Sequence, residues 1–335
     1  MKICFIIGFI LSSMVSQAQK NEWVHYQGSD GIGKGKHIVF ISGDEEYRSE
    51  EALPMLARIL AEKFGFRCTV LFAIDPKTGT IDPNNQTNIP GMKNLQTADL
   101  VFLFTRFREL PDEDMKFFDE YVRSGKPIVA LRTATHAFNY KRKKDSPYAK
   151  YDFQSKHKGW EDGFGKVILG ETWVDHHGNH GEEGTRALFN GIKQREKHPV
   201  LNGVKNIWCP TDVYAVRELP HGSEVLVYGA PTSGMTASSA VNLDKSIMPV
   251  AWTSTYTNES GKKGKIFTST MGAAIDLLSE DLRRLLVNAS LWAVGLENKI
   301  PAKADVNYIG QYTPTMFGLD LFAKDRSPSF YDARK

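Results

Sequence analysis

Short apolar segments alternate with amphipathic segments over the first 131 residues, and this alternation constrains the fold more than any other feature of the chain. The apolar segments are His37–Gly43, Arg67–Ile74, Leu100–Phe104 and Pro127–Leu131. Short runs of this kind, followed by glycine or polar residues, are typical of buried parallel strands. The alternation predicts an α/β fold in which a mostly parallel sheet has helices on both faces.

The boundaries of the helices can be predicted from their apolar spacing and flanking residues. The predicted helices cover Ser49–Phe64, Asp112–Ser124 and Leu282–Leu296. Ser49 is expected to cap the first helix through its hydroxyl group, and Gly65 is expected to end it. Further strands are predicted at Thr211–Val216, Glu224–Tyr228, Pro249–Trp252 and Lys265–Ser269.

Residues 1–18 have the pattern of a secretory signal peptide. Lys2 supplies a positive charge, Ile3–Val15 form an apolar core, and Ser16–Ala18 place small side chains where cleavage is expected. The apolar run is too short to span a bilayer comfortably. We therefore expect an exported protein, periplasmic or secreted if the source is a bacterium, without stable membrane insertion after cleavage.

Composition and charge limit the architecture and the partners. One domain is expected over residues 36–298, and residues 299–335 are expected to pack on it as an extension. Lysine and arginine number 42 against 39 acidic residues, a net charge of +3, which argues against a nucleic-acid partner. The basic run Lys141–Lys144 lacks an aromatic ladder and is predicted to be a solvated loop. Cys68 and Cys209 are predicted to be separate buried thiols, with one disulfide as the alternative.

The segment Trp173–Gly181 concentrates more chemistry than any other part of the chain. Asp175, His176, His177 and His180 lie within six residues of one another. Imidazole is a common ligand of transition metals, so a divalent metal such as zinc is one prediction for this segment. In that version His177 and His180 supply two nitrogens, and His136 or a carboxylate is the third ligand. The alternative is a polar loop whose histidines bond to each other and to the backbone.

Polar residues also follow three of the predicted parallel strands. The segments are Asp44–Arg48, Thr105–Arg108 and Arg132–His136. Right-handed crossovers place such loops at one edge of the sheet, where α/β proteins bind ligands. Glu46 is therefore predicted to act in acid/base chemistry. His136 is predicted to be a general base, a metal ligand or a donor to a sugar.

Other residues near this edge are candidates for substrate binding. Arg48, Arg106 and Arg132 suit sugar hydroxyls or anions, although structural ion pairs with the nearby glutamates are the alternative. Tyr47 and Trp173 offer aromatic faces to a sugar ring. No cysteine and no Gly-x-Ser-x-Gly motif occupies the turn before His136, which disfavours an amidase or a peptidase.

An ordered set of motifs resembles the ThuA-like (trehalose-utilisation) family. The motifs are Ser42–Ser49, Leu131–Phe138, Gly170–Gly178, Thr270–Ala274 and Leu282–Trp292. The resemblance implies a flavodoxin-like sheet similar to that of class I glutamine amidotransferases, without the amidotransferase cysteine. It also implies sugar metabolism, particularly of 3-keto disaccharides.

These observations together predict an exported enzyme that acts on a carbohydrate, such as a keto-disaccharide or a related glycoside, with metal-assisted acid/base chemistry. No nucleotide cofactor is predicted. The alternative is a non-catalytic carbohydrate-binding or scaffold protein on the same fold. Both predictions require the histidine segment to meet the strand-end loops at one edge of the sheet.

Overall fold

The computed structural model describes residues 22–189 and 197–332. Its α-helices are α1 (Ser49–Phe64), α2 (Asp112–Arg123) and α3 (Glu280–Ala293). The strands of its first half are β1 (Trp23–Tyr26), β2 (His37–Gly43), β3 (Arg67–Phe72), β4 (Leu100–Thr105) and β5 (Ile128–Leu131). Those that follow are β6 (His176–His177), β7 (Thr185–Leu188), β8 (Trp208–Cys209), β9 (Val213–Tyr214), β10 (Glu224–Pro231), β11 (Met248–Thr257) and β12 (Lys263–Ser269).

One large sheet organises the molecule. Its strand order within the described residues is β1-β3-β2-β4-β5-β12-β11-β10-β7-β8. The central strands β3, β2, β4, β5 and β12 are parallel, as the sequence predicts. Antiparallel pairs extend this centre on both sides, through β1 on one edge and from β11 to β8 on the other. The sheet therefore has the predicted parallel centre and is mixed where the antiparallel strands extend it.

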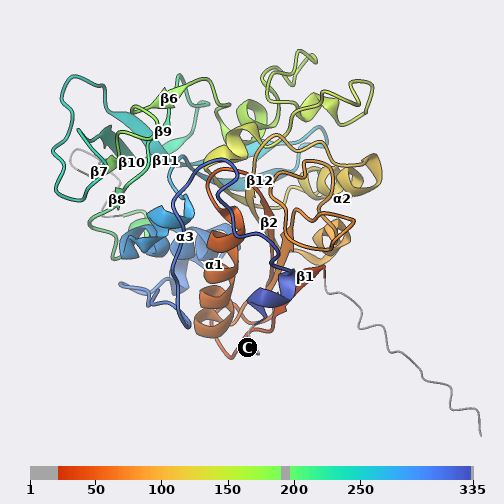
Figure 1. Ribbon diagram of the computed structural model, residues 1–335, viewed down its shortest axis with the longest axis horizontal. Helices are drawn as coiled ribbons and strands as arrows, with labels where there is room; N and C mark the ends of the chain where they lie inside the picture. The colour runs from red at the N-terminus through yellow and green to blue at the C-terminus, as the bar shows by residue number, and fades with distance from the viewer. Residues whose placement is uncertain (1–21, 190–196, 333–335) are drawn as a thin grey trace, which may run out of the picture.

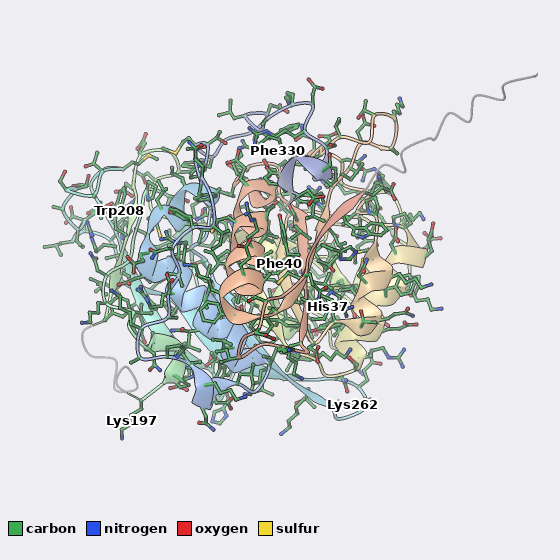
Figure 2. The ribbon with its side chains drawn as sticks, turned by 90° about the horizontal axis from the view of Figure 1, so that it is seen from below. His37, Phe40, Lys197, Trp208, Lys262 and Phe330 are labelled. Carbon is green, nitrogen blue, oxygen red and sulfur yellow. The ribbon has the colours of Figure 1, made fainter. Side chains whose placement is uncertain are left out.

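Helices cover both faces of the sheet, because its central strands are apolar on both sides. In β2, Ile38 and Phe40 pack in the core that includes residues of α1 and α3. The intervening Val39 and Ile41 pack in the core that includes residues of α2. Successive side chains of a strand point to opposite faces, so one strand supplies both cores. Figure 1 shows α1 and α3 side by side in front of the sheet, and Figure 2 labels Phe40 within β2.

The three predicted helices are confirmed, but the cap predicted for the first is wrong. Helix α1 begins at Ser49 without a side-chain cap, and the residue before it, Arg48, is in the left-handed conformation. The Ser49 hydroxyl instead bonds to the Ser42 hydroxyl at 2.8 Å and accepts the backbone N–H of Asp44 at 3.0 Å. The serine therefore fixes the loop after β2 and leaves the helix N-terminus uncapped.

Three further predictions concern the cysteines, the signal peptide and membrane insertion. Cys68 and Cys209 are separate buried thiols, as predicted. The predicted signal peptide, residues 1–18, lies outside the described residues. Within the described ranges, no helix has the length and apolarity needed to cross a bilayer.

The C-terminal tail, residues 300–332, lies against the domain. In Figure 1 its blue trace crosses in front of α1 and ends beside β1. The Tyr312 hydroxyl donates to the carbonyl of Ala274 at 2.8 Å, and the Tyr26 hydroxyl of β1 donates to the carbonyl of Tyr331 at 2.6 Å. The part of the tail between these two contacts reaches the loop after β2, at the carboxyl edge of the parallel strands.

Candidate functional site

The histidine segment is held by a short two-stranded sheet. Strand β6 pairs with β9 so that His176 lies opposite Tyr214 and His177 lies opposite Val213. Neighbouring residues of a strand point to opposite faces. His176 therefore faces Asp212, the residue before β9, while His177 points away from it. The register of this small sheet decides which histidines meet.

Two imidazoles converge on one buried carboxylate. Nδ1 of His176 lies 2.5 Å from Oδ2 of Asp212, and Nδ1 of His180 lies 3.1 Å from Oδ1 of the same residue. The two histidine rings are 4.9 Å apart between centroids. Burial alone would raise the pKa of Asp212, but the bond from His176 and the charge of Arg132 outweigh it and lower that pKa. Asp212 is thus a buried anion shared by two half-exposed rings.

The loop after β6 brings His180 back to the cluster. Gly178 has a φ of 101°, a conformation that favours glycine. A Cβ atom at this position would also lie only 3.2 Å from Cβ of Asp212, so both the backbone conformation and the available space disfavour a side chain. The backbone N–H of Asn179 donates to Glu183 at 2.6 Å. Lys245 donates to the Glu183 carboxylate at 2.6 Å. These two contacts of Glu183 fix the turn that carries His180.

Glu46 also lies at this cluster. Its Oε1 lies 3.1 Å from Nε2 of His180, and its Oε2 lies 3.5 Å from Arg106. His180 therefore has a carboxylate on each ring nitrogen, from Glu46 and from Asp212. Tyr47 is almost fully buried, and only its hydroxyl reaches the cluster, 3.5 Å from Nδ1 of His180. This enclosure contradicts the prediction that the Tyr47 ring stacks on a sugar.

The guanidinium groups of the three candidate arginines form hydrogen bonds or ion pairs with other groups of the protein. Arg48 is fully buried and donates to the backbone carbonyls of Gly318 and Glu45. Arg132 is also fully buried, and its φ of 41° is rare outside glycine. Its guanidinium donates to the carbonyl of Asp212 at 2.7 Å. Burial contradicts direct substrate binding by Arg48 and Arg132. Arg106 is partly exposed but is paired with Glu45 at 2.9 Å.

His136 lies behind the cluster, among aromatic rings. Its ring centroid is 5.0 Å from Phe107, 5.4 Å from Trp173 and 5.4 Å from Tyr214. Burial, aided by the charges of nearby arginines, lowers its pKa well below the ordinary value. His136 is therefore a neutral imidazole that packs against residues of the site, and it does not belong to the group of possible metal ligands.

Trp173 connects the cluster to a surface groove. Its ring is 5.4 Å from His136 and 6.0 Å from His176 between centroids, and it is only partly buried. On its other side it lines a groove of about 530 Å³ together with Phe153, Gln154, Lys156, Asp162, Thr172, Val174 and Arg217. The groove combines aromatic, charged and hydrogen-bonding side chains.

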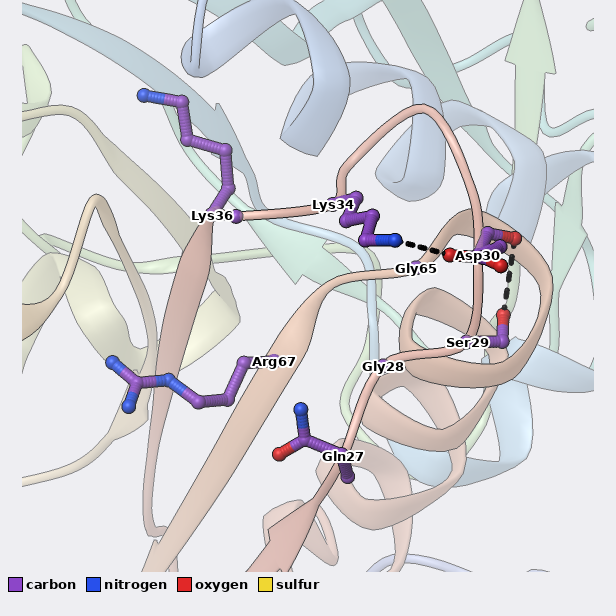
Figure 3. A pocket seen from close by; sticks show the side chains of 9 residues that line it. Gln27, Gly28, Ser29, Asp30, Lys34, Lys36, Gly65 and Arg67 are labelled. Atoms are coloured by element: carbon purple, nitrogen blue, oxygen red, sulfur yellow. Dashed lines mark hydrogen bonds and ion pairs between the residues drawn. The ribbon is translucent and has the colours of Figure 1, made fainter.

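A separate pocket of about 550 Å³ lies at the opposite, amino edge of the parallel strands (Figure 3). Lys36 precedes β2 there, and Arg67 begins β3. Its lysines are already paired, Lys34 with Asp30 at 2.5 Å and Lys36 with Asp99 at 3.2 Å. This pocket shares no residue with the cluster, and the loops predicted to be functional do not reach it.

The residues present fit a divalent metal, although not the predicted set. One ligand atom each from His176, His180 and Asp212 lies within 4.8 Å of the others. Ligand atoms on a single zinc ion lie about 3 to 4 Å apart, so small rotations would bring all three into range. His177 and Asp175 lie outside this group. The His177 ring is buried, and within the described ranges its Nε2 has no hydrogen-bond partner. The Asp175 carboxylate accepts the backbone N–H of His176.

Two residues of the site were missed from the sequence. Asp212 lies between β8 and β9, outside the three loops and the histidine segment that drew attention in the sequence. Phe317 comes from the irregular tail and packs 5.2 Å from the His180 ring between centroids. A weak signal for Asp212 existed in the Thr211–Val216 strand prediction, since an acidic residue at the start of a buried strand needs a partner.

The fold and the site together define a class of protein. It is an α/β protein with a histidine–carboxylate cluster at the carboxyl edge of its parallel strands, and the turn after β5 carries neither serine nor cysteine. The chain belongs to the ThuA family, described as trehalose utilisation, whose model matches residues 38–293.

Similarity to individual proteins is low. No curated protein has a significant match to this chain. A solved ThuA-like protein of Parabacteroides merdae is 17% identical, with a TM-score of 0.48, over 78% of this chain and 91% of its own. A ThuA-like protein of Bacteroides uniformis is 13% identical, with a TM-score of 0.48, over 80% of this chain and 95% of its own.

Proposed function

We propose that this protein is a carbohydrate-active enzyme in which His176, His180 and Asp212 bind a divalent metal. The single observation that carries the proposal is the convergence of the two imidazoles on the buried Asp212 carboxylate, at 2.5 Å and 3.1 Å. Two nitrogens and one carboxylate oxygen form a ligand set that catalytic zinc sites use, with a further position left for water or substrate.

The residues around the cluster would supply proton transfer and substrate binding. A bound metal would supply a water of lowered pKa and polarise a carbonyl or hydroxyl oxygen. Glu46 is the carboxylate beside the cluster that would take up and return a proton. Its position is held by Arg106, which lies 3.5 Å from its Oε2. Trp173 would stack on a sugar ring, and the groove beside it would hold that ring in place.

The substrate class rests on the family description and on this groove. Trehalose utilisation is the description of the family, and a groove of about 530 Å³ suits one or two sugar rings. We therefore propose a disaccharide or its 3-keto derivative as the substrate. The alternative is a carbohydrate-binding protein without turnover, in which the groove beside Trp173 would hold the sugar.

The test is product formation from a panel of disaccharides and their 3-keto derivatives, measured by mass spectrometry with zinc or manganese present. We expect turnover by the wild type and loss of turnover in His176→Ala. His177→Ala is the matched control, because the neighbouring histidine points to the other face of β6. Saturable binding of a sugar with no product would establish the alternative. Equal turnover in both variants would reject the assignment of the site.

Two further proposals concern fold type and location. The parallel strands have the order β3-β2-β4-β5-β12, which becomes 2-1-3-4-5 when these five are numbered along the chain. That order supports the flavodoxin-like, class I glutamine amidotransferase-like type. We also propose that the protein is exported to the periplasm or the medium, from the pattern of residues 1–18. A mature N-terminus at residue 19, found by mass spectrometry of the native protein, would support export.

A further inference from the structure

The C-terminal tail makes an unexpected contact with the cluster. Phe317 stacks on the Tyr47 ring with centroids 5.5 Å apart and an angle of 26°. It also packs against His180, with centroids 5.2 Å apart and an angle of 60°. Its side chain is buried by these two neighbours, with 8% of its surface exposed. His180 is the most exposed member of the cluster, and Phe317 covers one side of its ring.

The tail is fixed at this point by backbone bonds in both directions. The N–H of Gly318 donates to the carbonyl of Glu46 at 2.8 Å, and the carbonyl of Gly318 accepts from the buried Arg48 guanidinium. The φ of Gly318 is 143°, a conformation that favours glycine. Three residues earlier, the N–H of Thr315 donates to the Glu51 carboxylate at 2.8 Å. The two bonds of Gly318 thus join the tail to the loop that carries Glu46.

The tail therefore reaches His180 by two routes. Phe317 touches the ring directly, and Gly318 holds the backbone of Glu46, whose carboxylate lies 3.1 Å from Nε2 of His180. The region matched by the family model ends at residue 293, so Phe317 and Gly318 both lie outside it. Groups that orient a histidine ligand commonly alter metal affinity by about 10- to 100-fold when removed.

We propose that the C-terminal tail is a working part of the site and that Phe317 is a positioning residue for His180. Without the Phe317 ring, one side of the His180 ring would lose its packing partner, and the contacts with Asp212 and Glu46 would have to hold the ring against rotation toward solvent. This inference rests on the proposed function, since His180 is one of the proposed metal ligands. Phe317 itself need not touch the substrate.

The experiment measures Co²⁺ binding to the full-length mature protein by its visible absorption spectrum and by competition titration. We expect Phe317→Ala to weaken Co²⁺ binding about 10-fold, Phe317→Leu to weaken it less, and Phe317→Tyr to restore it to near the wild-type value. Phe330→Ala is the matched control. It removes an aromatic side chain from the same tail, but at an exposed position whose ring neighbour is Tyr331 (Figure 2 labels Phe330).

A second measurement separates failure of this inference from failure of the proposed function. The His180 ring signal of the metal-free protein is followed by NMR in the same variants. We expect it to broaden and shift in Phe317→Ala and to be unchanged in Phe330→Ala. Unchanged Co²⁺ affinity in Phe317→Ala, with wild-type binding intact, would overturn the tail inference. A wild type that binds no Co²⁺ would overturn the metal function, and an unchanged His180 signal would then overturn the positioning role as well.

Discussion

Oε1 of Glu46 lies 3.1 Å from Nε2 of His180, although the two residues are 134 positions apart in the sequence. One comes from the loop after β2, and the other comes from the turn after β6. The contact joins the acidic loop to the histidine segment, which is the convergence that an enzymatic function requires. It also leaves Glu46 with two candidate roles, orienting His180 or transferring a proton.

Glu46→Gln separates these two roles. The amide keeps the size and one acceptor of the carboxylate but cannot take up a proton. We expect metal affinity to change less than about 10-fold, while turnover falls by about 100-fold or more, as is usual for loss of a general acid/base. Titration with Zn²⁺ and a steady-state assay on the same preparation check this. Parallel losses in both quantities would assign Glu46 to orientation alone.

Glu50 should make stability depend on pH. Its side chain is buried, with Oε1 3.9 Å from the Arg48 guanidinium, and within the described residues neither carboxylate oxygen has a hydrogen-bond partner. Burial raises its pKa to about 8. Between about pH 4.5 and 8 the unfolded chain releases this proton while the folded protein retains it, so the stability present at low pH is lost as pH rises. The loss amounts to about 4 to 5 kcal/mol.

The check is the melting temperature of wild type and Glu50→Gln between pH 4 and pH 9. The glutamine cannot ionise, so the variant should gain stability relative to wild type as pH rises, with the gain complete above about pH 8. Parallel curves for the two proteins would show that Glu50 is not neutral in the folded state.

Glu45 should be a structural carboxylate. It lies 2.6 Å from the fully buried Arg108 and 2.9 Å from Arg106. Glu45→Gln would leave the Arg108 charge buried without its counterion, and we expect a loss of about 3 kcal/mol in the free energy of unfolding. Urea denaturation measures it. The exposed pair of Arg58 and Glu62 is the control, and Glu62→Gln should cost less than about 0.5 kcal/mol. Equal effects would mean that burial does not strengthen the Glu45 pair.

Trp173 should contribute to sugar affinity. It borders both His176 and the groove, and its ring is partly exposed. Loss of one stacking ring costs about 1 kcal/mol, so we expect Trp173→Ala to weaken sugar binding about 5-fold. Isothermal titration with the sugar identified by the product screen measures the change. Trp208→Ala, on β8 and outside the groove, should bind normally, and a matching loss there would point to general destabilisation.

Much of the fold was predictable because its signals are local. The four apolar runs of the first half became β2 to β5, and the amphipathic spacing after Ser49 became α1 with its end at Gly65. The antiparallel extension was less predictable. Strands such as β1, β7 and β8 pair with strands that are distant in the sequence, and segments of two to four residues are too short for their alternation to be recognised in the sequence alone.

The site was predictable only in part, for a related reason. The histidine segment is evident in the sequence, but whether His176 or His177 faces Asp212 depends on the pairing of β6 with β9, and a shift of one residue reverses the faces. Asp212 and Phe317 reach the site through tertiary contacts alone. The burial of Arg48 and Arg132 beneath the loops and the tail has no sequence pattern.

The most direct test of the account is the zinc stoichiometry and affinity of the purified protein, measured by mass spectrometry under native conditions and by competition titration, for wild type, Asp212→Asn and His177→Ala. The account predicts one zinc ion per chain in the wild type, a loss of affinity of at least about 100-fold in Asp212→Asn, and near-normal binding in His177→Ala. No stoichiometric zinc in the wild type, or a loss confined to His177→Ala, would contradict it.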